Sequence, residues 1–152
     1  MNASQVLRKY HGDQSYPIDV LSIAKQAGAS VIFCDLSGLA GEFILENTDQ
    51  PIIKINANDI DVRQRFTLAH ELGHMFLEHG SRHRKDGNSN FNVLGDPIEM
   101  QANSFAAELL MPIEFINHML YKLKITNVAR MAKEFNVSAA AMHYRLKNLR
   151  II

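Results

Sequence analysis

Apolar residues recur at helical spacing along most of the chain, and three short apolar runs have the pattern of strands. The strand candidates cover 30–34, 41–45 and 52–55 and are separated by Gly, Asn, Asp and Pro residues. Because the connections are short, we expect an antiparallel or mixed sheet rather than a doubly wound parallel one. Helices are predicted over 4–10, from Pro17 to a stop at Gly28, from Asn58 or Asp59 to about His79–Gly80, and over 97–110, 112–123, 127–135 and 139–149.

The longest predicted helix has the most regular apolar stripe. Asn58 or Asp59 is positioned to cap this helix, and Asp61 lies favourably in its first turn. Thr126 and Ser138 are expected to cap the last two helices. The stripe of the long helix consists of Val62, Phe66, Ala69, Gly73 and Phe76.

The strongest chemical signal is the sequence His70-Glu71-Leu72-Gly73-His74, which falls inside this long helix. Positions i and i+4 lie one turn apart on one helix face, so both imidazoles can reach a single metal ion. Glu71 projects beside the metal, where it can take a proton from a metal-bound water. Zinc lowers the pKa of such a water toward about 7 and polarises the carbonyl under attack.

A catalytic zinc needs a third protein ligand and one open position. Glu99 on the next helix is the best candidate, with Glu108 and His83 as alternatives. His79 is five residues beyond His74, which rotates it off the ligand face. Asn103 lies one turn after Glu99, where its oxygen could accept the outer N–H of a ligating histidine. The two helices can approach closely because the second is rich in small residues, namely Ala102, Ala106 and Ala107.

Residues 63–74 and 99–112 together resemble the ImmA/IrrE family of bacterial and phage metallopeptidases. The stretches 17–28, 52–56 and 132–146 resemble it too, so the resemblance covers nearly the whole chain. It implies a zincin-like core with zinc held by His70, His74 and Glu99, and with Glu71 as general base. It also implies that the substrate is one DNA-binding transcriptional repressor, cut at one site. Some members carry C-terminal sensor domains, which we do not expect in a sequence that ends at Ile152.

Other residues could assist the reaction. A positioned donor usually supports the oxyanion that forms when hydroxide adds to a peptide carbonyl. Tyr144 is our candidate for this catalytic role, with its neighbours His143 and Arg145 as alternatives, although no spacing rule places them at the metal. Arg63 and Arg65 are expected to form a solvated face or structural ion pairs. On family grounds, strand 41–45 is a candidate for a sheet edge that pairs with the substrate backbone.

Charge is balanced overall but not along the chain. The chain has 16 Lys and Arg residues and 16 Asp and Glu residues. From Lys122 onward, however, it has seven basic residues and one acidic residue, Glu134, so the net charge is +6 there and −6 in the residues before it. Residues 126–149 have helix-turn-helix spacing, but the second helix opens with three alanines, which cannot read bases. We therefore expect a metallopeptidase core over 1–123 and a helical pair over 124–152. This pair is expected to pack on the core or to dock a partner protein rather than to bind DNA.

Composition excludes several kinds of protein and of metal site. A single cysteine, Cys34, excludes an intramolecular disulfide and a Cys-cluster metal site, and its apolar surroundings predict a buried, inert thiol. No secretory signal is visible, and no run approaches the roughly 18 apolar residues of a membrane-spanning helix. A cytoplasmic protein without membrane contact is expected. Residues 81–92 are polar and predict an exposed loop of unusual length, either functional or disordered.

The main hypothesis is thus an α+β zinc endopeptidase that cleaves a helix-turn-helix repressor, expected to be the product of a neighbouring gene, and so controls a gene switch. An alternative of another class is a non-proteolytic, zinc-containing binding module, such as the toxin-like partner of a helix-turn-helix regulator or antitoxin. A third hypothesis is a DNA-binding protein that acts through residues 126–150.

Overall fold

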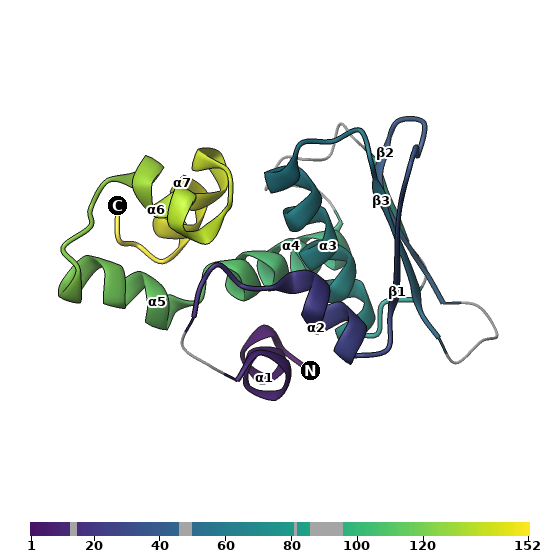
Figure 1. Cartoon of the computed structure of the whole chain (residues 1–152), viewed down its shortest axis with the longest axis horizontal. Helices are drawn as coiled ribbons and strands as arrows, with labels where there is room; N and C mark the ends of the chain where they lie inside the picture. Colours follow the sequence, from purple (N-terminus) through teal and green to yellow (C-terminus); the bar gives the residue numbers. More distant parts are fainter. Residues whose placement is uncertain (13–14, 46–49, 81, 86–95) are drawn as a thin grey trace.

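The computed structural model describes residues 1–12, 15–45, 50–80 and 96–152, together with the backbone of 82–85. It is a mixed α+β fold in which helices lie on one side of a small sheet (Figure 1). Two short π-helical segments are labelled η1 and η3. The helical elements are α1 (Ala3–Val6), η1 (Leu7–His11), α2 (Val20–Gln26), α3 (Asp61–Phe76), α4 (Pro97–Leu110), α5 (Ile113–Asn117), η3 (His118–Lys122), α6 (Val128–Phe135) and α7 (Ala139–Asn148).

The sheet is mixed, as its short connections predicted. Its strands are β1 (Ser30–Cys34), β2 (Leu39–Ile44), β3 (Ile52–Asn56) and β4 (Arg82–Lys85), in the order β1-β3-β2-β4. β1 runs parallel to β3, whereas β2 is antiparallel to both β3 and β4.

Two predictions about the sheet are wrong. β4 lies in a segment that we expected to be a loop, since its sequence Arg-His-Arg-Lys has no apolar alternation. The segment is nevertheless a strand, because its backbone pairs with β2. The same pairing makes β2 an inner strand, so the predicted edge at 41–45 is not an edge of the sheet. The remainder of the predicted loop, residue 81 and residues 86–92, lies outside the described residues.

The helices lie where the sequence pattern predicted them, but several ends and caps differ. The predicted end of the long helix near His79–Gly80 is wrong, because α3 ends at Phe76 and Glu78 then adopts a left-handed conformation. α2 begins after Asp19, whose side chain accepts from the Ser22 N–H, so Pro17 is not in its first turn. The residue before α3 is Ile60 rather than Asn58 or Asp59, and it makes no side-chain cap. At the C-terminal end, Asn127 rather than Thr126 caps α6, while Ser138 caps α7 as predicted.

α3 lies at the centre of the molecule. It packs on β2 and β3 of the sheet and on the helices α2 and α4. Figure 1 shows α6 and α7 at the end of the molecule away from the sheet. One continuous cluster of buried side chains runs from the sheet through α3 and α4 into α6 and α7. Its largest fully buried members include Phe43, Phe135, Ile53, Leu72, Leu109, Met111 and Met119.

Arg65 connects three separate segments of this fold. Its guanidinium donates to the carbonyl oxygens of Ile18 at 2.9 Å, Asn136 at 3.0 Å and Phe135 at 3.2 Å. Burial lowers the pKa of Arg65, and the charge of Asp61 opposes that shift. The side chain is thus a structural anchor for the turn between α6 and α7, and not a solvated residue.

Two further sequence predictions concern the burial of Cys34 and the presence of a membrane-spanning helix. Cys34 is only partly buried, because β1 is an outer strand of the sheet, so the predicted burial of its thiol is wrong. No helix in the described part of the chain is long and apolar enough to cross a membrane.

Candidate metal centre

His70 and His74 occupy one face of α3, as their i, i+4 spacing requires. Both side chains are buried, with 1% and 0% of their surfaces exposed. Their Nε2 atoms lie 3.1 Å apart. The helix therefore aims two imidazoles at one point, which is what the sequence motif predicted.

Glu99 reaches the same point from α4. This helix begins with Pro97 after Asp96, whose carboxylate accepts from the N–H groups of Ile98 and Glu99 and so fixes the first turn. Oε2 of Glu99 lies 2.7 Å from Nε2 of His74 and 3.4 Å from Nε2 of His70. We call His70, His74 and Glu99 the metal cluster.

The metal cluster fits a divalent cation. Ligands placed tetrahedrally at about 2.0–2.1 Å from zinc are about 3.3 Å from one another, close to the separations of 2.7, 3.1 and 3.4 Å among the three ligand atoms. Two nitrogens and one carboxylate oxygen form a donor set that zinc accepts. Because these atoms converge in a buried place, their mutual repulsion is relieved by a cation between them.

The carboxyl group of Glu99 is ionised in this arrangement. Burial by itself raises its pKa, but the neighbouring side chains of His70 and His74 lower it more strongly, to well below its usual range. The group is therefore available as an anionic ligand.

Glu71 is fully buried and faces the sheet rather than α4. It follows His70 by one residue, which turns it by about 100° around the helix axis. A Cβ atom added to Gly41 of β2 would lie 3.1 Å from Glu71 Oε1 and 2.5 Å from Thr67 Cγ2. The absence of a side chain at Gly41 thus allows the β2 backbone to pass directly beside this carboxyl group.

Asn103 contacts the metal cluster from outside, as its position on α4 suggested. Nδ1 of His70 donates to Oδ1 of Asn103 at 2.7 Å, and Asn103 is itself buried. An amide oxygen can only accept, so the hydrogen of His70 resides on Nδ1 and the lone pair on Nε2 points into the cluster.

His79 makes two contacts that the sequence did not predict. It is not a member of the metal cluster, which agrees with the prediction that it is no ligand. However, its Nδ1 lies 2.9 Å from Nδ1 of His74, and its Nε2 lies 2.9 Å from Oε1 of Gln101 on α4. The signal in the sequence was a third imidazole shortly after the motif and an amide two residues after Glu99.

The other candidate residues lie outside the metal cluster. Tyr144 is half-buried on α7 and lines, together with Asn103, a cavity of about 50 Å³. His143 is exposed, and Arg145 donates to the carbonyl of Met111 at 3.0 Å. Glu108 is not in the cluster either, and its charge raises the pKa of Arg145, which burial lowers more strongly.

Two further residues singled out in the sequence are Arg63 and His83. Arg63 forms an i, i+4 ion pair with Asp59 at 3.5 Å, as one of the predicted alternatives had it. The side chain of His83 lies outside the described residues.

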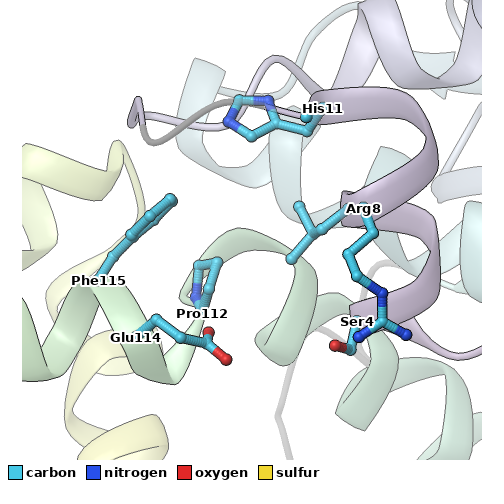
Figure 2. Close-up of a pocket in the computed structure, with 8 residues that line it drawn as sticks. Ser4, Arg8, His11, Pro112, Glu114 and Phe115 are labelled. Carbon is cyan, nitrogen blue, oxygen red and sulfur yellow. The ribbon is translucent and has the colours of Figure 1, made fainter.

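A surface pocket lies apart from the metal cluster. It lies between the N-terminal helical segment and α5, and Figure 2 shows Arg8, His11, Glu114 and Phe115 around it. None of its lining residues belongs to the metal cluster or contacts it through the hydrogen bonds described above.

Comparison with known proteins agrees with the chemistry of the metal cluster. Residues 24–147 match the family model of the IrrE N-terminal-like domain. The chain is 32% identical over 146 residues to the metallopeptidase ImmA of Bacillus subtilis, covering 86% of this chain and 83% of that protein.

Two longer relatives match over part of their length. The chain is 36% identical over 99 residues to the radiation response metalloprotease IrrE of Deinococcus deserti, covering 62% of this chain and 35% of that protein. It is 35% identical over 123 residues to the protein of the same name from Deinococcus radiodurans, covering 78% and 37%. The buried His-His-Glu cluster and these matches together show that the chain belongs to the ImmA/IrrE family and is a metallopeptidase.

Proposed function

We propose that this protein is a zinc-dependent endopeptidase with a zincin-like core, and that it hydrolyses one peptide bond in a helix-turn-helix transcriptional repressor. The observation that carries the proposal is the convergence of His70, His74 and Glu99 next to the buried carboxyl group of Glu71. Cleavage of the repressor derepresses the genes it controls. Such a substrate is cytoplasmic, so the enzyme acts in the cytoplasm.

The side chains of the metal cluster hold the zinc ion in this proposal. When bound, zinc supplies a Lewis acid that polarises the scissile carbonyl and makes hydroxide available near neutral pH. Glu71 is the general base: it accepts a proton from the attacking water and passes it to the leaving amine. Its full burial supports this role, because a carboxylate away from bulk water is a stronger base.

Tyr144 is proposed to stabilise the oxyanion by donating its phenol O–H. In support, Tyr144 and Asn103 line the same small cavity, and Asn103 is hydrogen-bonded to His70. The neighbours of Tyr144 are poorer candidates, because His143 is exposed and Arg145 is engaged by the carbonyl of Met111.

We also propose that α6 and α7 contact the substrate rather than DNA. Their connecting turn is held against α3, because Arg65 and Asp61 both bind Asn136. The first turn of α7 presents alanines, which offer no hydrogen bonds to base edges. The exposed cations of the pair suit an acidic partner surface, and they include Arg130, Lys133 and Lys147.

The test is incubation of the purified protein with the repressor encoded by its genomic neighbour, read by mass spectrometry with and without a chelator. We expect stoichiometric zinc in the wild type and in Glu71→Gln, and one new pair of fragments from the wild type alone. Loss of the general base should slow cleavage by about 10²–10⁴-fold.

Absence of stoichiometric zinc, or equal cleavage by the wild type and Glu71→Gln, would contradict the proposal. A stable complex with an uncut repressor would favour the non-proteolytic binding module instead.

A further inference from the structure

A chain of two hydrogen bonds leads outward from the metal cluster. It starts at Nδ1 of His74, passes through the imidazole of His79 and ends at Oε1 of Gln101, and both donor–acceptor distances are 2.9 Å. His74 is fully buried, His79 is partly buried and Gln101 is exposed. The chain therefore connects the buried ligand to the surface of α4, the helix that also carries Glu99.

The end of α3 places His79 in this chain. The helix stops at Phe76, and Glu78 adopts a left-handed conformation with φ 60°. The N–H of His79 then donates to the carbonyl of His74 at 2.9 Å, and the N–H of Glu78 donates to that of Met75 at 3.3 Å. These are the bonds of a Schellman motif, which folds the chain back over the last helical turn. The imidazole of His79 is thereby returned to the ligand that precedes it by five residues.

The direction of the hydrogen bonds follows from the chemistry of the ligand. If Nε2 of His74 binds a cation, its hydrogen is on Nδ1, and this N–H donates to Nδ1 of His79. His79 must then carry its own hydrogen on Nε2, which donates to Oε1 of Gln101. An amide oxygen cannot donate, so Gln101 fixes the tautomer of His79, and His79 fixes the tautomer of His74.

We infer that His79 and Gln101 are positioning residues that orient His74 for metal binding, as Asn103 does for His70. The inference rests on the proposed zinc site. Outer partners of this kind raise the basicity of the ligating imidazole and restrict its rotation, and their loss typically weakens metal affinity by about 10–100-fold. Because Gln101 lies two residues from Glu99 on α4, the chain also ties the outer side of one ligand to the helix that supplies another.

The test measures zinc affinity by competition with a chromophoric chelator, and the visible spectrum of the cobalt-substituted protein. His79→Phe keeps a ring but loses the acceptor, and Gln101→Leu loses the terminal acceptor. We expect both to weaken zinc binding, His79→Phe by about 10–100-fold, and to alter the cobalt spectrum. His79→Asn and Gln101→Glu, which retain an acceptor oxygen, should stay within a few-fold of the wild type.

Controls separate this inference from protein stability and from the proposed function. His118→Phe replaces an exposed histidine on η3 and should leave zinc affinity unchanged. Thermal unfolding of the metal-free variants reports any loss of fold, and Gln101→Leu tests the chain at an exposed position even if His79→Phe folds poorly. The double variant should lose no more affinity than His79→Phe alone, because both changes interrupt one chain.

Wild-type zinc affinity in His79→Phe and Gln101→Leu would overturn the inference while leaving the zinc site intact. Equal losses in His79→Asn and His79→Phe would also overturn it, because the hydrogen bond would then not be the cause. Failure of the wild type to bind zinc would instead reject the proposed function.

Discussion

The two histidines of the metal cluster differ in what holds their outer nitrogens. His70 donates to an amide oxygen of Asn103, a group that can only accept. His74 contacts another imidazole, His79, whose own hydrogen is fixed by Gln101. The first arrangement takes one residue and the second takes two, because an imidazole accepts at one nitrogen only when its hydrogen is on the other.

The Asn103 contact predicts a direct effect on metal binding. Asn103→Ala removes the acceptor for His70 Nδ1, so the imidazole is no longer held in one tautomer and orientation, and zinc affinity should fall by about 10–100-fold. Chelator competition measures the change. Ser104→Ala is the matched control, since Ser104 is the exposed neighbour of Asn103 on the same helix. An unchanged affinity in Asn103→Ala would show that this hydrogen bond does not support the ligand.

Close contact between α3 and α4 brings the metal cluster together. A Cβ atom at Gly73 would lie 3.1 Å from Cα and 3.2 Å from the carbonyl oxygen of Ala102, and 3.3 Å from Cβ of Phe105. Two of these atoms are backbone and cannot move without moving α4. The glycine between the two histidines thus sets the distance at which Glu99 reaches them.

This contact predicts that Gly73→Ala lowers both stability and zinc affinity. Alanine in a helix interior normally gains about 1 kcal/mol over glycine, but crowding of a packed contact costs about 1–3 kcal/mol. We expect the second effect to prevail, so urea denaturation should show a lower free energy of unfolding. Displacement of α4 should weaken zinc binding as well. A variant more stable than the wild type would show that α4 accommodates the methyl group.

Several segments distant in sequence are joined through α3. Arg65 binds the carbonyls of Ile18, Phe135 and Asn136, which belong to the N-terminal segment and to the C-terminal helical pair. Nδ2 of Asn136 also donates to Asp61 at 3.0 Å. The helical pair is therefore attached through the same helix that carries His70 and His74.

Replacement of Arg65 tests how strongly this attachment contributes to stability. Arg65→Lys keeps the charge but cannot reach three carbonyls at once, and each lost bond from a charged donor is worth about 1.5–3 kcal/mol. The midpoint of urea unfolding should fall accordingly. Arg130→Lys, at an exposed position on α6, should leave the midpoint unchanged. Equal midpoints in the two variants would contradict an anchoring role for Arg65.

Patterns in the sequence predicted the features that depend on residues near each other along the chain, namely helix faces and helix starts. The helical period placed His70 and His74 on one face, and Pro97 and Ser138 marked helix starts that the structure has. The strand 82–85 escaped prediction because its backbone is ordered by hydrogen bonds to β2 and not by its own side-chain pattern. That pairing also decided which strands form the edges of the sheet.

The sequence by itself determined that His70 and His74 share one helix face with Glu71 beside them, and it identified the family, because these features depend on spacing within one helix and on motifs read along the chain. Only the tertiary structure decided that Glu99 meets the histidines, that His79 turns back onto His74, and that Gln101 completes the chain. Those contacts depend on the distance between two packed helices and on a left-handed residue after one of them, and neither quantity is encoded in local periodicity.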